Sequence, residues 1–315
     1  MIGALMIAAS AGLGAFATQD LAMEVDGLDG PLAGTFVSPA EPLAEPVIII
    51  PGSGPTDRDG NNPAGIRAAS YQLLAEGLAR AGIPSLRIDK RGMFASGSAI
   101  SDANEVTIED YATDVTDWAR TLRERTGRDC VWLAGHSEGG LVALRAAALA
   151  PEGLCGIVLL AAPGRPLGTI LREQLAANPA NAFLLPEAER HIAALERGEP
   201  VTEPVHPALG PLFGPQLRTF LTSLFAQDPA RLAAEIELPI LILQGLEDIQ
   251  VTEADARALA EAAPTARLVL LEEVNHLFKP VPAGDRAANL AAYADPDLPL
   301  ADGVVASIAE FLTER

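Results

Sequence analysis

Short, largely apolar runs recur along the chain and alternate with longer segments whose apolar residues have helical spacing. The runs hold four to seven residues each, and most are bounded by Pro, Gly or charged residues, which predicts buried strands. The predicted strands are residues 21–25, 31–37, 47–50, 84–89, 131–134, 156–162, 239–245 and 266–271. Asp-Gly turn signals separate the first two, so we expect these to form an antiparallel hairpin.

Helices are predicted between most of these strands. The longer helical segments are residues 66–81, 107–126, 141–149, 252–263 and 304–315. Gly82 and Pro84 form a helix stop after the first segment, and Thr107 is a suitable N-cap for the second. Strands that alternate with helices predict an α/β fold with a mostly parallel central sheet and helices on both faces.

The pattern changes between residues 165 and 236, where helical pieces alternate with Pro-rich breaks and no strand-like run occurs. These helical pieces are residues 170–177, 187–197, 216–226 and 230–235. We therefore expect a helical insert at 165–236 within a core made of residues 18–164 and 237–315.

Composition and charge exclude several classes of protein. The 315 residues are 49% apolar, which is too much for a disordered chain and enough for a large core. The net charge is −20, from 42 acidic and 22 basic residues. A surface this acidic argues against nucleic-acid binding and against docking on anionic lipid.

The N-terminal segment predicts export. Residues 2–17 are apolar, uncharged and rich in small side chains, and Ala15-Phe-Ala17 fits an A-x-A cleavage site. We expect residues 1–17 to be a secretory signal peptide, which implies a periplasmic or secreted protein with no stable membrane insertion after cleavage. No Lys or Arg precedes the apolar run. An ordered N-terminal arm and a cytoplasmic location therefore stay open as the alternative.

One stretch has the pattern of a nucleophile turn. The apolar run 131–134 is followed by Gly135-His-Ser-Glu-Gly139, which fits G-x-S-x-G, and then by the predicted helix 141–149. A Ser on a sharp turn between strand and helix projects its hydroxyl above the sheet. Side chains two residues before and after it would collide, so both positions need Gly. The stretch predicts Ser137 as a nucleophile.

With these flanks the chain resembles the α/β-hydrolase superfamily, and more narrowly bacterial serine hydrolases and esterases of the S33 aminopeptidase-like kind. The resemblance rests on Gly135-His-Ser-Glu-Gly-Gly140, Pro51-Gly-Ser-Gly-Pro-Thr-Asp-Arg-Asp-Gly-Asn61, Asp89-Lys-Arg-Gly92, Gly245-Leu-Glu-Asp248 and Asn275-His276. It implies the α/β-hydrolase fold, with the insert at 165–236 serving as a helical cap over the active site.

The candidates for catalysis are Ser137, Asp248 and His276, which follow predicted strands in the chain order Ser, Asp, His expected for this superfamily. His276 would take the proton of Ser137 and later give it to the leaving group, while Asp248 would hold the imidazole. Glu247 is the alternative acid, although the G-x-x-D register favours Asp248. We expect His136 to serve packing, since the turn directs its side chain elsewhere.

The resemblance also assigns the oxyanion hole to the backbone N–H groups of Ser53 and Glu138, with Pro51 in place of the usual His. Gly54 is the second choice in this loop and a predicted substrate contact. The charged triplet 57–59 is expected to hold the loop in place. Phe94 occupies the second glycine position of the superfamily's D-x-R-G-x-G turn, where it would line the acyl pocket or only pack.

Apolar residues of the cap are expected to face the substrate or to pack the cap onto the core. They are Leu184, Leu212, Phe213 and Phe220, and among them we single out Phe213 as a substrate contact. The two cysteines, Cys130 and Cys155, open strands that are neighbours in this fold. They would form a disulfide in an exported protein and two buried thiols in the cytosol. Neither has the spacing of a metal site, and we expect no metal and no cofactor.

A Ser nucleophile fits acyl transfer to water. The resemblance points to hydrolysis of a small-molecule carboxylic ester with a short acyl chain. A serine aminopeptidase or amidase stays open, because the cap offers glutamates that could bind a substrate amine, namely Glu187, Glu189, Glu196 and Glu199. A non-catalytic binding protein on this fold is a further alternative. The sequence leaves the oligomeric state open.

Overall fold

The computed structural model describes residues 19–314, so the predicted signal peptide lies outside the described residues. These residues form an eight-stranded sheet in the order β1-β2-β4-β3-β5-β6-β7-β8. The strands are β1 (Gln19–Asp26), β2 (Pro31–Ser38), β3 (Val47–Ile50), β4 (Ser85–Ile88), β5 (Val131–His136), β6 (Leu154–Leu160), β7 (Ile240–Gly245) and β8 (Arg267–Leu271). The β1–β2 hairpin is antiparallel and β2 is antiparallel to β4, while the remaining pairs are parallel. The predicted hairpin and mostly parallel sheet are confirmed.

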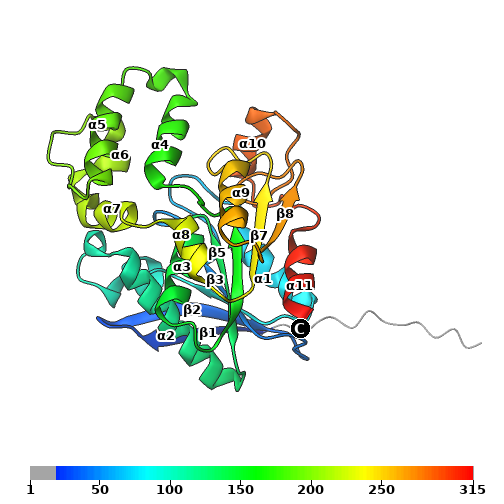
Figure 1. Ribbon diagram of the computed structural model, residues 1–315. Helices are drawn as coiled ribbons and strands as arrows, with labels where there is room; N and C mark the ends of the chain where they lie inside the picture. The colour runs from blue at the N-terminus through cyan, green and yellow to red at the C-terminus, as the bar shows by residue number, and fades with distance from the viewer. Residues whose placement is uncertain (1–18, 315) are drawn as a thin grey trace, which may run out of the picture.

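Helices cover both faces of the sheet (Figure 1). On one face, α2 (Ile108–Thr126), α3 (Glu138–Leu149), α8 (Pro229–Glu235) and α9 (Glu253–Ala262) bury one apolar core. On the other face, α1 (Ser70–Arg80) and α11 (Val304–Thr313) bury the second. The central strands β3, β5, β6 and β7 are buried along their whole length, which explains why they read as continuous apolar runs.

Local capping decides where the helices begin and end. Thr107 caps α2, as predicted, and does so in a reciprocal capping box with Asp110. Gly127 ends the helix in the left-handed conformation. In contrast, α1 begins at Ser70 and not near residue 66, because residues 61–69 form a loop closed by a bridge between Asn62 and Ile66. A further helix, α10 (Arg286–Ala292), was not predicted; Asp285 caps it inside a Pro- and Ala-rich stretch.

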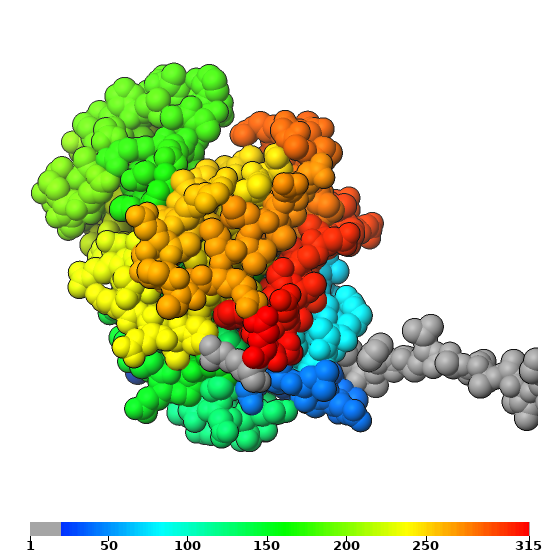
Figure 2. Space-filling model, turned by 45° about the vertical axis from the view of Figure 1, so that its right-hand side comes forward, coloured from blue at the N-terminus to red at the C-terminus, as the bar shows by residue number. Residues whose placement is uncertain are grey.

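The segment between β6 and β7 is helical, as expected. Its elements are α4 (Leu167–Ala176), η3 (Pro179–Asn181), α5 (Leu185–Glu196), η4 (Pro207–Leu209), α6 (Gly210–Phe213), η5 (Pro215–Leu217), α7 (Arg218–Phe225) and α8. The elements from α4 to α7, which we call the cap lobe, share an apolar core of their own. The lobe stands apart from the region around α10 (Figure 2). By contrast, α8 packs on the main core through Leu232 and Ala233.

Cys130 and Cys155 are joined by a disulfide, with a Cα–Cα distance of 5.2 Å. Cys130 directly precedes β5 and Cys155 lies in the neighbouring strand β6. Of the two states left open for these cysteines, a disulfide and two buried thiols, the structure has the disulfide. Across the part of the chain that is described, no helix is both long and apolar enough to cross a membrane.

Candidate active site

The turn between β5 and α3 holds Ser137 in a strained backbone conformation. Its φ and ψ are 54° and −124°, a region that non-glycine residues rarely occupy. A Cβ at Gly135 would lie 2.1 Å from the carbonyl oxygen of Gly139, and one at Gly139 would lie 2.4 Å from that of Ile50. Both glycines are thus required by direct backbone contact, which is the physical basis of the G-x-S-x-G pattern.

Asp248 and His276 lie together behind this turn. The Nδ1 atom of His276 is 2.6 Å from Oδ2 of Asp248, and both side chains are buried. A carboxylate can only accept, so the network assigns the proton to Nδ1 and leaves Nε2 of His276 free to act as a base. The alternative acid, Glu247, accepts instead from the N–H of Gly284 at 2.9 Å. The structure therefore pairs His276 with Asp248, not with Glu247.

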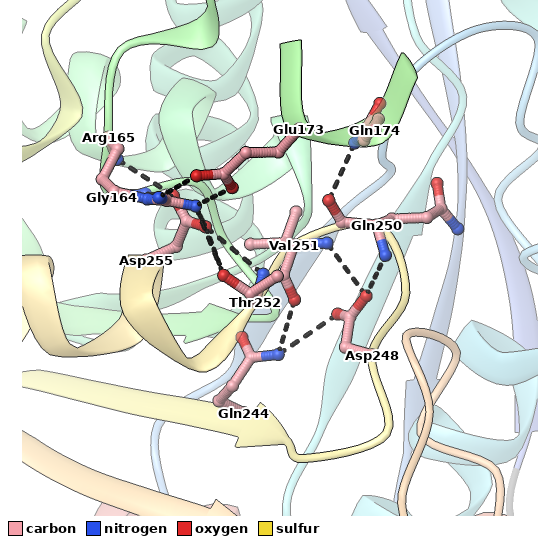
Figure 3. A network of polar contacts seen from close by, with 10 residues as sticks. All are labelled: Gly164, Arg165, Glu173, Gln174, Gln244, Asp248, Gln250, Val251, Thr252 and Asp255. Carbon is pink, nitrogen blue, oxygen red and sulfur yellow. Dashed lines mark hydrogen bonds and ion pairs between the residues drawn. The ribbon is translucent and has the colours of Figure 1, made fainter. Parts of the chain in front are cut away.

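The loop after β7 fixes the carboxylate of Asp248 (Figure 3). Its Oδ1 accepts from the N–H groups of Gln250 at 2.7 Å and Val251 at 2.9 Å. Its Oδ2 also accepts from the side-chain amide of Gln244 at 3.2 Å. These three donors hold the carboxylate of Asp248 in the orientation in which its Oδ2 accepts from the imidazole of His276.

The same loop is tied to the cap lobe (Figure 3). Gln174 of α4 donates to the carbonyl of Gln250 at 2.8 Å. Arg165 bridges Glu173 of α4 and the buried Asp255 of α9 with contacts of 2.7 and 2.8 Å. The start of the lobe is therefore attached to the segment that orients Asp248.

Two cavities meet at Ser137. The smaller, of about 90 Å³, is lined by both Ser137 and His276 together with the loop after β3. The larger, of about 260 Å³, is lined by Ser137 and by apolar side chains of the cap lobe, such as Ile170 and Leu212. Ser53 borders both cavities, whereas His276 borders only the smaller of the two.

The loop after β3 lies against the Ser137 turn. A Cβ at Gly52 would be 3.2 Å from that of Ser137. Ser53 and Glu138 both line the larger cavity, and no hydrogen bond within residues 19–314 uses the N–H of either residue. The two predicted oxyanion donors are thus brought together next to Ser137. Gly54, with φ 68°, borders neither of these cavities.

The three predicted substrate contacts, Gly54, Phe213 and Phe94, line neither cavity at Ser137 and need correction. Phe213 is fully buried in the core of the cap lobe, with its ring 5.4 Å from that of His191, and the neighbouring Leu212 lines the larger cavity in its place. Phe94 is 46% exposed and lines neither cavity. Its φ of 47° lies in the left-handed region that favours glycine, so Phe94 adopts this turn at the cost of strain.

The charged triplet 57–59 has a structural role. Arg58 pairs with Asp89 at 2.5 Å, and Asp59 pairs with Arg87. Asp57 accepts from the N–H groups of Asp59 and Asn61. These contacts fasten the loop to the end of β4, as predicted, although the partners lie on the strand and not only within the triplet.

A buried hydrogen-bond network behind the site was not predicted from the sequence. The Tyr71 hydroxyl is 2.7 Å from Nδ1 of His136 and accepts from the N–H of Gly52 at 3.0 Å. The Nε2 of His136 lies 2.8 Å from the carbonyl oxygen of His276. That oxygen can only accept, so Nε2 carries the proton and Nδ1 accepts from Tyr71. Burial, helped by the neighbouring His276, lowers the pKa of His136 to about 3, so the ring is neutral near neutral pH.

We predict that Tyr71→Phe lowers the free energy of unfolding by about 1–3 kcal/mol, because two buried groups lose their partner at once. These groups are the Nδ1 of His136 and the N–H of Gly52. Urea denaturation measures the change. Tyr293→Phe is the control, since the hydroxyl of the half-buried Tyr293 accepts from one group, the side-chain amide of Gln250. Equal losses in the two variants would contradict the role given to Tyr71.

No group of three or more His, Cys, Asp or Glu side chains among residues 19–314 is placed to hold a metal ion. The sheet order, the strained Ser turn and the paired Asp248 and His276 define an α/β hydrolase. The chain belongs to the family described as serine aminopeptidase, S33, whose model matches residues 65–278.

Esterase EstD of Thermotoga maritima is 28% identical over 237 residues, which cover 74% of this chain and 54% of EstD. This chain thus spans about half the length of the curated relative that it matches. Est1E from Butyrivibrio proteoclasticus has a similar fold, with a TM-score of 0.54, 18% identity and coverage of 87% of this chain and 95% of Est1E. The Pyrococcus furiosus esterase Pf2001 in space group C2221 gives a TM-score of 0.53 at 18% identity over 83% of each chain.

Proposed function

We propose that this protein is a serine hydrolase that cleaves carboxylic esters through an acyl-enzyme, with Ser137, His276 and Asp248 as its triad. One observation carries the proposal, namely the 2.6 Å hydrogen bond between Asp248 and a His276 that shares a cavity with the strained Ser137. The esterase name of the EstD relative supports the same reaction class.

In this mechanism the Ser137 hydroxyl attacks the ester carbonyl while Nε2 of His276 takes its proton. The developing oxyanion accepts from the N–H groups of Ser53 and Glu138, and loss of one such donor costs about 10²–10³-fold in rate. His276 then protonates the leaving alcohol. A water molecule, activated by the same imidazole, releases the acid and restores Ser137.

A fluorophosphonate probe tests the proposal, because it reacts only with an activated serine. The wild type should be labelled, Ser137→Ala should not be, and the exposed Ser98→Ala should be labelled like the wild type. If the wild type is not labelled, the proposal fails and the non-catalytic binding protein becomes the better reading.

The alternative of an aminopeptidase requires a free carboxylate for the substrate amine. The four candidate glutamates of the cap lobe are engaged elsewhere and border neither cavity at Ser137. Glu189 and Glu196 pair with Arg172, Glu199 pairs with Arg197, and Glu187 accepts from the N–H of His206. We therefore expect p-nitrophenyl acetate to be hydrolysed faster than an aminoacyl anilide. The reverse order would favour the peptidase.

The two cavities also support an orientation for the ester. The group that protonates the leaving alcohol must lie beside it, and His276 borders only the smaller cavity. The alcohol then occupies the smaller cavity and the acyl chain the larger, under the cap lobe. The volume of about 260 Å³ lies below the roughly 300–1,000 Å³ of pockets for drug-sized ligands, which favours short acyl chains.

We predict that Leu212→Ala moves the preference of the enzyme toward longer acyl chains. Leu212 lines the larger cavity, and each additional methylene that fits should change the relative kcat/KM by about 10-fold. A series of p-nitrophenyl esters from acetate to octanoate measures this. Leu217→Ala is the matched control, because Leu217 belongs to the same lobe core without lining that cavity. An unchanged chain-length profile in Leu212→Ala would place the acyl chain elsewhere.

Export remains part of the proposal. The disulfide between Cys130 and Cys155 supports an oxidising compartment, since such bonds are rare in the cytosol. N-terminal sequencing of protein from its native host tests it. A mature chain that begins at Thr18 would support export, and one that begins at Met1 would count against it.

A further inference from the structure

Lysine occurs at only two positions of this chain, Lys90 and Lys279, and both side chains are buried. Lys90 follows β4 and reaches under the loop after β3. Its ammonium group donates to the carbonyl oxygen of Gly52 at 2.6 Å and lies 3.4 Å from Oε1 of Glu138. It also lies 5.2 Å from the centre of the Tyr111 ring. The triad does not use this buried cation.

The contact with Gly52 acts on a particular peptide unit. The carbonyl of Gly52 and the N–H of Ser53 belong to the same planar group, and the described chain contains no cis peptide bond. In a trans unit the two bonds point in opposite directions. A cation that holds the Gly52 oxygen therefore fixes the direction of the Ser53 N–H. It also draws electron density toward that oxygen, which makes the N–H a stronger donor.

The contact with Glu138 involves the second donor residue. Glu138 lines the larger cavity, and its buried carboxylate faces Lys90. Tyr71 holds the preceding peptide by accepting from the N–H of Gly52. One ammonium group thus contacts the peptide unit that carries the Ser53 N–H, through the Gly52 carbonyl, and the side chain of Glu138. It lines neither cavity at Ser137.

We propose that Lys90 is a positioning residue of the oxyanion hole, which orients and polarises the Ser53 N–H through the Gly52 carbonyl. This inference rests on the proposed esterase function. The competing explanation is that Lys90 only neutralises the buried carboxylate of Glu138, in which case its effect is on folding and not on the transition state.

The two explanations differ in kinetics. An interaction made with the transition state alone lowers kcat and leaves KM nearly unchanged. For Lys90→Met we expect kcat for p-nitrophenyl butyrate to fall by about 10- to 100-fold, less than the loss of a whole donor, with KM within about 3-fold of the wild type. Lys90→Arg keeps a cation that can donate to Gly52 and should recover most of the activity.

A double variant keeps the test decisive if Lys90→Met folds poorly. Lys90→Met with Glu138→Gln leaves no unpaired buried charge, so it should regain stability in urea denaturation. The positioning role predicts that its kcat stays low. Neutralisation alone predicts that its kcat returns to that of Glu138→Gln. Lys279→Met is the matched control, because Lys279 is the other buried lysine and donates to the carbonyl of Leu298.

Rates are expressed per active site titrated with the fluorophosphonate probe. A wild type that is neither labelled nor active through Ser137 would overturn the proposed function. A Ser137-dependent enzyme whose kcat is unaffected by Lys90→Met, or restored in the double variant, would overturn the Lys90 inference alone.

Discussion

Asp248→Asn should lower kcat for ester hydrolysis by about 10⁴-fold while leaving the fold intact. An asparagine at this position can still accept from the N–H groups of Gln250 and Val251 through its oxygen. Its NH₂ group would then face Nδ1 of His276, which currently donates to the carboxylate. The imidazole would be forced into the tautomer with the proton on Nε2, where it cannot take a proton from Ser137.

The surrounding side chains do not rescue the variant. Gln244 also donates toward Oδ2 of Asp248, so the new NH₂ group would meet a second donor. Rotating that amide to accept would give up its bonds to the carbonyls of Gly245 and Val251. Glu247→Gln is the control, because Glu247 is the adjacent acid and its side chain accepts from the N–H of Gly284 instead of from His276. A large loss in Glu247→Gln with a small one in Asp248→Asn would reverse the assignment.

Replacing Cys130 and Cys155 together by Ala should lower the free energy of unfolding by about 3 kcal/mol. The disulfide closes a loop across a sequence separation of 25 residues and joins the strand that leads to Ser137 to its neighbour. Without it the unfolded chain regains the entropy of that loop, while the parallel pairing of β5 and β6 remains. The melting temperature should fall by roughly 6–12 °C, at about 2–4 °C per kcal/mol.

Thermal unfolding with and without dithiothreitol measures this effect. Reductant should lower the melting temperature of the wild type to near that of the double variant and should leave the variant unchanged. Activity per active site at 25 °C should be retained, because the bond lies at the end of β5 opposite to Ser137. A wild type that is insensitive to reductant would contradict the assignment of stability to this bond.

Elements with strong local signals could be predicted from the sequence. The central strands β3, β5, β6 and β7 are apolar runs that the fold buries, and the start of α2 is predictable because Thr107 caps it through a local contact. The Ser137 turn was recognisable because its two glycines stand in a fixed local pattern around the serine. For Gly135 the colliding backbone is that of Gly139 within the same turn, whereas for Gly139 it is that of Ile50 on β3.

The features that the sequence analysis missed depend on packing between distant segments. Tyr71 and His136 are 65 positions apart, and His136 and His276 are 140 apart, so no local pattern indicates their hydrogen bonds. Phe213 was predicted to line the substrate cavity, but its neighbour Leu212 does so, and the reason for this error is different. They lie in the four-residue helix α6, which is too short for periodicity to show which side faces the cavity.

The burial of both lysines has a practical consequence for the chemistry of the surface. Reagents that acylate primary amines, such as succinimidyl esters, would find no lysine on the folded, described part of the molecule. Attachment to a solid support or a dye should therefore go through the abundant carboxylates. Slow uptake of an amine label at Lys90 or Lys279 would in turn report local opening of the native state.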